Sequence, residues 1–258
     1  YTSLRWLHLV FVGCCGFPIS RSRYYRLFNT VELQETFYNP PDLDKLKKYR
    51  SEAPENFAFA LKAWQAITHP LDSMTWRRAR FVPDRKLADR YGFLRPTREV
   101  FEAWEKVVEG ARVLRARVIV IQTPPSFGYS RDGYKNAVDF FSAVDTGEFI
   151  VGWEPRGSWL QNADKVFEIV SRFKNVIHIV DPFKTLPILD RDTVYFRLHG
   201  IGKGEVNYRY RYSDDDLKRL SDMVRKYSGK EVYVMFNNVY MAQDAQRFIA
   251  IFNQTTDL

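Results

Sequence analysis

Short apolar runs recur eight times along the chain and are separated by longer segments with many polar residues. Each run is rich in Val, Ile, Phe or Tyr and is short enough to form a β-strand. The runs occupy residues 8–15, 30–38, 57–64, 117–124, 148–156, 175–182, 193–200 and 231–238. Strands that alternate with helical segments predict a parallel sheet. Eight such units predict an α/β fold, a single (β/α)8 barrel of the TIM type, with its functional residues at the carboxyl ends of the strands.

Most connections between the runs carry a helical pattern with a start signal. Thr97 precedes apolar residues at helical spacing, which predicts a helix over residues 97–115. Ser213 and the three aspartates that follow it predict a capped helix with an acidic first turn. After the sixth run, the prolines of residues 181–189 allow at most a short helix. Further helices are predicted over residues 158–173 and 240–252.

The length of the chain agrees with one barrel, because such barrels typically have about 250 residues and this chain has 258. No Gly/Ser-rich or Pro-rich linker divides it, so we expect a single domain over residues 1–258. With 45% hydrophobic and 16% aromatic residues, the chain can fill a large core.

The two cysteines, Cys14 and Cys15, are adjacent within the first apolar run. This arrangement is poor geometry for a structural disulfide and the wrong spacing for a zinc site. We therefore expect buried thiols in a cytoplasmic protein, and a reactive or metal-binding thiol is the alternative. No run approaches the roughly 20 apolar residues of a membrane-spanning helix, so we expect no membrane partner.

Positive charge is concentrated in one segment of a chain whose net charge is +8. Residues 76–98 contain eight basic and two acidic residues and fall in the long connection after the third strand. Such a loop lies over the mouth of a barrel, so it could be a lid that attracts anions or a surface that faces DNA or RNA. Arg77, Arg78 and Arg80 are the candidate nucleic-acid contacts. The alternative is an ordinary solvated surface or a set of ion pairs.

Alternation along each strand predicts which polar side chains point into the barrel. For strands six and eight the alternation is ambiguous, so Asp181 competes with His178, and Asn237 competes with Asn238. The other inward positions include Glu32 and Gln34, Lys62, Gln122, Glu154 and Arg156, and Tyr195, Arg197 and His199.

These inward residues combine a carboxylate, an imidazole and several cations. Glu154 and His199 could act as an acid and base pair, with Asp181 as a further catalytic candidate. Lys62, Arg156 and Arg197 would bind a carboxylate or phosphate group. The alternative is an ion-pair network that only fills a polar interior.

A divalent metal is a second possibility for the same part of the barrel. Glu32, Glu154, Asp181 and His199 are candidate ligands, although the neighbouring cations would repel the ion. No metal-binding sequence motif occurs, so we predict no cofactor and leave a divalent metal open.

A glycine-rich loop follows the seventh strand, with Gly200, Gly202 and Gly204 around Lys203. Small residues let backbone N–H groups face an anion, although a flexible turn is an equal alternative. Tyrosines at 208, 210 and 212 alternate with arginines and could stack on bases or sugars, or could form a packed loop edge.

Six motifs in order along nearly the whole chain resemble the DUF72 family, the YecE-like proteins. They are VELQETFY, FALKAWQAITHP, VIVIQTPPSF, WEPRGSW, YFRLHG and VMFNN. The resemblance implies a TIM-type barrel that is loosely related to sugar isomerases. One departure is Gly157, which stands where the family pattern has a histidine beside the arginine. The resemblance marks Glu32, Thr36, Phe37 and Tyr38; Lys62, Thr68 and His69; Gln122, Pro124 and Pro125; Glu154, Arg156, Ser158 and Trp159; Arg197, His199 and Gly200; and Asn237 and Asn238.

Together these observations predict an enzyme that uses acid–base chemistry on an anionic substrate of the phosphorylated sugar or nucleotide type. One alternative is a metal-dependent nuclease or sugar isomerase. Another is a protein that binds nucleic acid without catalysis. A third is Schiff-base chemistry at Lys62.

Overall fold

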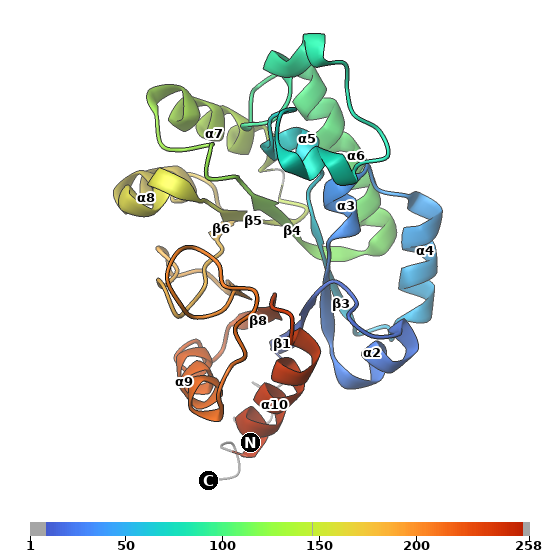
Figure 1. Ribbon diagram of the computed structural model, residues 1–258, viewed down its shortest axis with the longest axis vertical. Helices are drawn as coiled ribbons and strands as arrows, with labels where there is room; N and C mark the ends of the chain where they lie inside the picture. The colour runs from blue at the N-terminus through green and yellow to red at the C-terminus, as the bar shows by residue number, and fades with distance from the viewer. Residues whose placement is uncertain (1–8, 146, 255–258) are drawn as a thin grey trace. The chain divides into compact units, whose positions relative to one another are not determined.

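Eight strands alternate with helices along the chain in the computed structural model, which describes residues 9–145 and 147–254 (Figure 1). The strand order in the sheet is β6-β5-β4-β3-β2-β1-β8-β7, and each strand pair with a defined register is parallel. This is the topology of the (β/α)8 barrel, as predicted. The strands are β1 (Val10–Cys15), β2 (Thr30–Leu33), β3 (Ala58–Lys62), β4 (Ala116–Gln122), β5 (Ile150–Glu154), β6 (Val176–His178), β7 (Thr193–Leu198) and β8 (Glu231–Phe236).

The described residues divide into two compact units. Unit 1 contains residues 9–32, Pro54–Ala58 and 178–254, and unit 2 contains Leu33–Ala53 and the described part of Phe59–Ile177. The helices of unit 1 are α2 (Arg21–Leu27), α9 (Asp214–Arg225) and α10 (Met241–Gln254). Unit 2 has α3 (Glu35–Tyr38), α4 (Leu43–Glu52), α5 (Gln65–Thr68), α6 (Arg98–Leu114), α7 (Arg131–Val144) and α8 (Ala163–Val170), and the 3-10 helices η1 (Met74–Arg78), η2 (Arg85–Arg90) and η3 (Gly157–Gln161).

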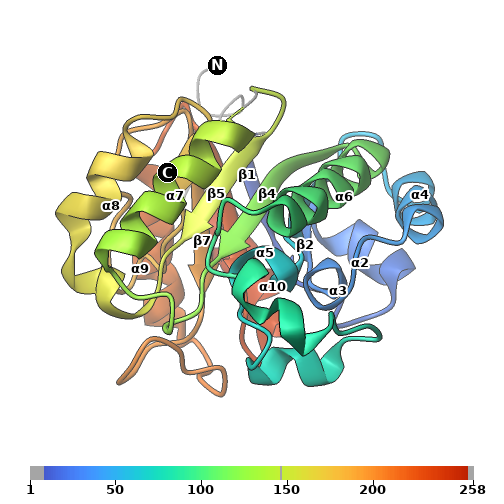
Figure 2. The ribbon, with the colours of Figure 1, turned by 90° about the horizontal axis from the view of Figure 1, so that it is seen from above.

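Two helices confirm the start signals in the sequence. The Thr97 hydroxyl accepts a hydrogen bond from the Val100 N–H at 3.3 Å, and α6 begins at the next residue and packs against α4 (Figure 2). Ser213 and Asp216 form a reciprocal capping box at the start of α9. Both helices bury one apolar stripe, so the helical pattern of the sequence is also the packing surface.

Two predicted elements differ from the structure. The second strand ends at Leu33, and the aromatic residues after it belong to α3, where the Thr36 hydroxyl donates to the Lys62 carbonyl at 2.7 Å. The predicted helix over 158–173 is divided into η3 and α8 at Asn162, whose backbone is not helical. The start of the first predicted strand, residue 8, lies outside the described residues.

The connection between β6 and β7 contains no helix among its described residues, in agreement with its prolines. Cys14 and Cys15 are buried and are not in a disulfide, as predicted, and burial raises the pKa of Cys14 to about 12. Within residues 9–145 and 147–254, no helix is long and apolar enough to cross a membrane.

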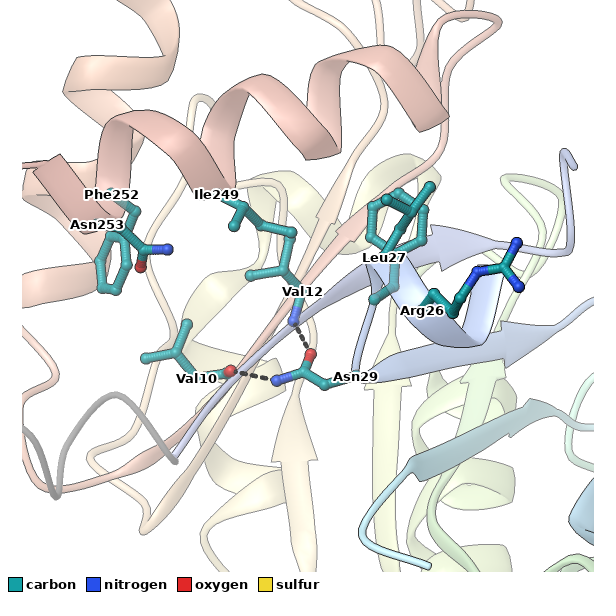
Figure 3. Close-up of a pocket in the computed structure, with 9 residues that line it drawn as sticks. Val10, Val12, Arg26, Leu27, Asn29, Ile249, Phe252 and Asn253 are labelled. Carbon is teal, nitrogen blue, oxygen red and sulfur yellow. Dashed lines mark hydrogen bonds between the residues drawn. The ribbon is translucent and has the colours of Figure 1, made fainter. Parts of the chain in front are cut away.

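A pocket of about 340 Å³ lies near the amino end of β1, lined by residues of β1, α2 and α10 (Figure 3). The Asn29 side chain bonds there to the backbone of β1, as a neighbouring strand would. Its amide nitrogen donates to the Val10 carbonyl at 2.9 Å, and its amide oxygen accepts from the Val12 N–H at 2.7 Å. Val10 and Val12 belong to the first half of β1, whereas the candidate functional residues follow the carboxyl ends of strands. The polar groups of Asn29 in this pocket are therefore bonded to the backbone of the sheet.

Candidate functional site

The last residues of three neighbouring strands form a polar cluster in unit 2. Lys62 ends β3, Gln122 ends β4 and Glu154 ends β5, and Gln122 is in register with Glu154. The Lys62 ammonium donates to the Gln122 side-chain oxygen at 2.7 Å. The Arg156 guanidinium donates to the Glu154 carboxylate at 2.8 Å, with both side chains nearly buried. Together with His69, these residues are called the β3–β5 cluster.

His69 joins this cluster from the end of α5. Its Nδ1 atom is 2.7 Å from the Thr68 hydroxyl, and its ring meets Phe37 edge to face at 4.8 Å. The Lys62 ammonium lies 3.9 Å from the centroid of the same Phe37 ring. Burial, and then the positive charges of Lys62 and Arg156, lower the pKa of His69 to about 3. His69 is therefore a neutral imidazole at neutral pH.

The charges of the β3–β5 cluster do not cancel. Lys62 and Arg156 carry two positive charges, Glu154 carries one negative charge, and Gln122 and His69 are neutral. Lys62 hydrogen bonds to a neutral amide within the cluster, and Arg156 to a carboxylate. The cluster therefore places two cations and one carboxylate in a nearly buried position, where electrostatic interactions are stronger than in water.

A second charged group, in unit 1, is built around Glu32. One Glu32 carboxylate oxygen accepts from the Arg197 guanidinium at 2.9 Å, and the other accepts from the Tyr195 hydroxyl at 2.9 Å. The Cys15 sulfur also lies 3.9 Å from the guanidinium. Glu32 and Arg197 are fully buried, with side-chain exposures of 0% and 1%. Strand alternation placed these residues among the inward positions but did not pair them, and the structure shows Glu32 as a carboxylate partner of Arg197.

His199 follows β7 in unit 1 and is held by two other predicted residues. Its backbone N–H donates to the Asp181 carboxylate at 3.1 Å, and its Nδ1 atom is 3.1 Å from the Asn237 amide nitrogen. Because an amide N–H₂ group only donates, this arrangement places the proton of a neutral His199 on Nε2. The other Asp181 oxygen accepts from the Phe183 N–H at 3.1 Å.

The alternative residues of strands six and eight have different contacts in the structure. Asp181 and Asn237 contact His199, whereas Asn238 donates to the Tyr210 carbonyl and to Asp244. His178 accepts from the Ile188 N–H at 3.3 Å.

The glycine loop after β7 keeps Lys203 exposed. Gly200 has φ of 89°, and a Cβ there would lie 2.1 Å from the Asn207 carbonyl oxygen, so only glycine fits. Of the three alternating tyrosines, only Tyr208 is exposed. Tyr210 donates to Asp216 at 2.6 Å, and the Tyr212 hydroxyl accepts from the Gly200 N–H at 2.8 Å. Of the two alternatives for these tyrosines, the packed loop edge is therefore correct for Tyr210 and Tyr212.

Tyr208 is a neighbour of His199 that the sequence did not identify. The two rings lie 6.0 Å apart in an edge arrangement, and the Tyr208 carbonyl accepts from the Val239 N–H at 2.7 Å. The alternating tyrosines were visible in the sequence. No local pattern indicated which of them faces the histidine, because the loop must first fold back along residues 238–240.

Trp159, which the resemblance marks, has a packing role. It is fully buried, its indole N–H donates to the Phe127 carbonyl at 2.7 Å, and its ring meets Trp153 at 5.2 Å. The hydroxyl of neighbouring Ser158 accepts from the Tyr129 N–H at 2.8 Å. These contacts fix the chain after Arg156.

The basic segment after β3 is well ordered by its contacts and mostly exposed. Arg77, Arg78 and Arg80 are all exposed. Arg78 lies over the Tyr38 ring at 4.1 Å and donates to its hydroxyl at 2.6 Å. Part of the segment does form ion pairs, as the alternative predicted: Arg90 with Glu99, and Arg98 with Glu102.

Among residues 9–145 and 147–254, no group of three or more His, Cys, Asp or Glu side chains is arranged to hold a metal ion. The four candidate ligands in the sequence are therefore not gathered into such a group.

The fold and these polar strand ends define a TIM-barrel protein. The chain belongs to the DUF72 family, described as proteins of unknown function, whose model matches residues 20–257. A search of curated proteins found no match.

Solved structures share the fold. A DUF72 family protein from Enterococcus faecalis is 19% identical with a TM-score of 0.69, covering 96% of this chain and 98% of its own. A DUF72 family protein from Thermotoga maritima is 20% identical with a TM-score of 0.62, covering 96% and 99%. Endonuclease IV from Thermus thermophilus is 8% identical with a TM-score of 0.52, covering 96% and 99%. At these identities the likeness shows the fold alone.

Proposed function

We propose that this protein is an enzyme that uses acid–base chemistry on a small anionic substrate. The observation that carries the proposal is the gathering of Lys62, Glu154 and Arg156 at the carboxyl ends of neighbouring strands, beside His69, whose pKa is lowered by burial and by these two cations. Lys62 and Arg156 would bind the anionic group, with Arg156 able to offer a planar pair of donors. A phosphorylated sugar or a nucleotide-type compound has the required chemistry.

Glu154 has the contacts of a base. Its pairing with Arg156 stabilises the ionised carboxylate, which is the form that accepts a proton. We assign this role from contacts inside unit 2 alone.

His199 has the contacts of a proton donor or a polarising group. Asn237 holds its Nδ1 atom and Asp181 holds its backbone, so the Nε2–H bond is fixed in direction. A neutral imidazole with this tautomer can polarise a carbonyl group by donating a hydrogen bond. We assign this role from contacts inside unit 1 alone.

The test is a turnover screen of phosphorylated sugars and nucleotides, together with binding of inorganic phosphate by calorimetry. Glu154→Gln and His199→Asn should each abolish turnover and leave the melting temperature nearly unchanged. Lys174→Gln, which removes an exposed charge elsewhere, should behave like the unmodified protein. If both catalytic variants unfold the protein, the charged groups serve packing and the proposal fails.

A further inference from the structure

Residues 74–86, called here the 74–86 segment, expose large apolar side chains in unit 2. Met74 is 63% exposed, Phe81 is 61% exposed and Val82 is 43% exposed. Single exposed apolar residues are common on protein surfaces, but three within one short segment point to an interaction site.

The same segment carries exposed positive charge. Arg77, Arg80, Arg85 and Lys86 are exposed, and among the described residues none of their side chains forms an ion pair. Asp84 is the one acidic residue of the segment, and its carboxylate accepts from the Lys86 N–H at 2.9 Å as the cap of η2. The segment therefore combines apolar side chains with at least four available cations.

Contacts at both ends hold this surface in place. At its start, the buried Trp76 donates its indole N–H to the Pro70 carbonyl at 2.9 Å, and the Asn39 side chain accepts from the Arg80 N–H at 2.7 Å. The segment is the teal part of the chain in Figure 2, and η1 packs against α3.

After η2, the chain returns through left-handed backbone at Gly92, Phe93 and Leu94, whose N–H groups donate to carbonyls of α5 at 2.8 to 3.1 Å. Left-handed backbone is unfavourable for Phe and Leu, so it persists only where surrounding contacts hold it. The hydrogen bonds to α5 are such contacts, and they fix the conformation of this connection. The exposed apolar side chains of the 74–86 segment are therefore carried by a backbone that these contacts hold in place.

We propose that the 74–86 segment docks this protein on the surface of an anionic lipid bilayer. The cations would lie at the headgroups, where each contributes about 1 kcal/mol, and Phe81, Val82 and Met74 would enter the boundary of the acyl chains. The phosphates of a nucleic acid would bind the cations, and a base could stack on Phe81. A nucleic acid would, however, offer no apolar surface to Met74 and Val82. A second copy of the chain is disfavoured because the same cations would face each other.

The proposal goes beyond the proposed function and does not depend on it. The sequence-based expectation of no membrane partner rested on the lack of a spanning segment, and peripheral docking needs none. The new observation is that Phe81 and Val82 are exposed, because an apolar sequence pattern alone would place these side chains in the interior.

The test is co-sedimentation of the full chain with vesicles. We expect binding to vesicles of phosphatidylcholine mixed with phosphatidylglycerol, and none to pure phosphatidylcholine. Arg77→Gln with Arg80→Gln should weaken binding about thirty-fold. Met74→Ser with Phe81→Ser, which keeps every charge, should weaken it at least about ten-fold.

Matched controls remove the same chemistry elsewhere in unit 2. Phe167→Ser removes a phenylalanine that is 45% exposed on α8, and Arg131→Gln with Lys174→Gln removes two exposed charges. These variants should bind vesicles like the unmodified protein. Circular dichroism melting would confirm that all variants fold.

Two outcomes would overturn the proposal. The first is no binding to the anionic vesicles, including the case in which a fluorescent single-stranded oligonucleotide binds instead and loses affinity in the arginine variant. The second is vesicle binding that the Met74 and Phe81 variant does not weaken, which would mean that only non-specific charge attraction holds the protein on the vesicles.

Discussion

The two charged groups of this protein differ in how their charges are compensated. In unit 1, Glu32 is fully buried and receives one hydrogen bond from Arg197 and another from Tyr195. In the β3–β5 cluster of unit 2, two cations are accompanied by a single carboxylate, and His69 is held neutral. The first group pairs its cation with a carboxylate, whereas the second contains one cation more than it has carboxylates.

Under the proposed function, the charged residues of these two groups serve different purposes. Glu32 and Arg197 are fully buried and bonded to each other, so the ion-pair alternative describes these two residues well. Lys62, Glu154 and Arg156 are slightly exposed, at 6 to 8%, and under the proposed function they bind the substrate. Four experiments test this distinction.

The largest effect is expected from breaking the buried pair. Arg197→Met removes the cationic partner of Glu32 and should lower the free energy of unfolding by about 3 to 5 kcal/mol, measured by urea denaturation. Replacing both partners, Glu32→Leu with Arg197→Met, should recover much of that loss because no uncompensated charge stays buried. A loss below about 1 kcal/mol in the single variant would contradict a structural role.

The next effect concerns pH and His69. Its pKa is lowered from 6.5 to about 3, so between these values the unfolded chain binds a proton that the folded protein does not. Stability from this group is fully present above about pH 6.5 and is lost as the pH falls towards 3, with a slope of up to about 1.4 kcal/mol per pH unit.

Urea denaturation of His69→Gln between pH 6.5 and 4.5 measures this effect. The variant should lose stability less steeply on acidification than the unmodified protein, and the two curves should run parallel above pH 7. Identical slopes throughout would mean that His69 is protonated in the folded state, and the charge count of the cluster would then be wrong.

A moderate effect is expected on anion binding by the β3–β5 cluster. Lys62→Met keeps the aliphatic stem but removes the charge, so phosphate affinity should fall roughly ten- to hundred-fold in calorimetry. The free energy of unfolding should change by no more than about 1 kcal/mol. Lys174→Met is the matched control and should keep full affinity. Large destabilisation with unchanged affinity would place Lys62 with the structural pair.

The smallest effect is expected at the surface. Arg112 and Glu148 form a two-point ion pair at 2.7 Å, the same bonding chemistry as the buried pair, but their side chains are 60% and 38% exposed. Because water and salt screen such a pair, Arg112→Ala should leave the urea midpoint within experimental error. A clear shift would show that bonding geometry, rather than burial, separates the charged groups of this protein.

Much of the fold could be predicted from local patterns. Short apolar runs located all eight strands, and the caps at Thr97 and Ser213 located the starts of two helices. The same patterns failed over residues 34–38, because the Thr-Phe-Tyr sequence of α3 has strand propensity, and the hydrogen bond from Thr36 to the Lys62 carbonyl belongs to a neighbouring strand end.

Strand alternation named most of the candidate residues, but it did not indicate which of them contact one another. The sequence by itself determined the (β/α)8 topology, the strand ends that carry polar groups, and the buried thiols, because each depends on periodicity or on neighbours in the chain. Only the tertiary structure decided that Arg197 pairs with Glu32, that His69 is neutral and that Phe81 is exposed. Those properties depend on solvent access and on groups far apart in sequence, which no local pattern contains.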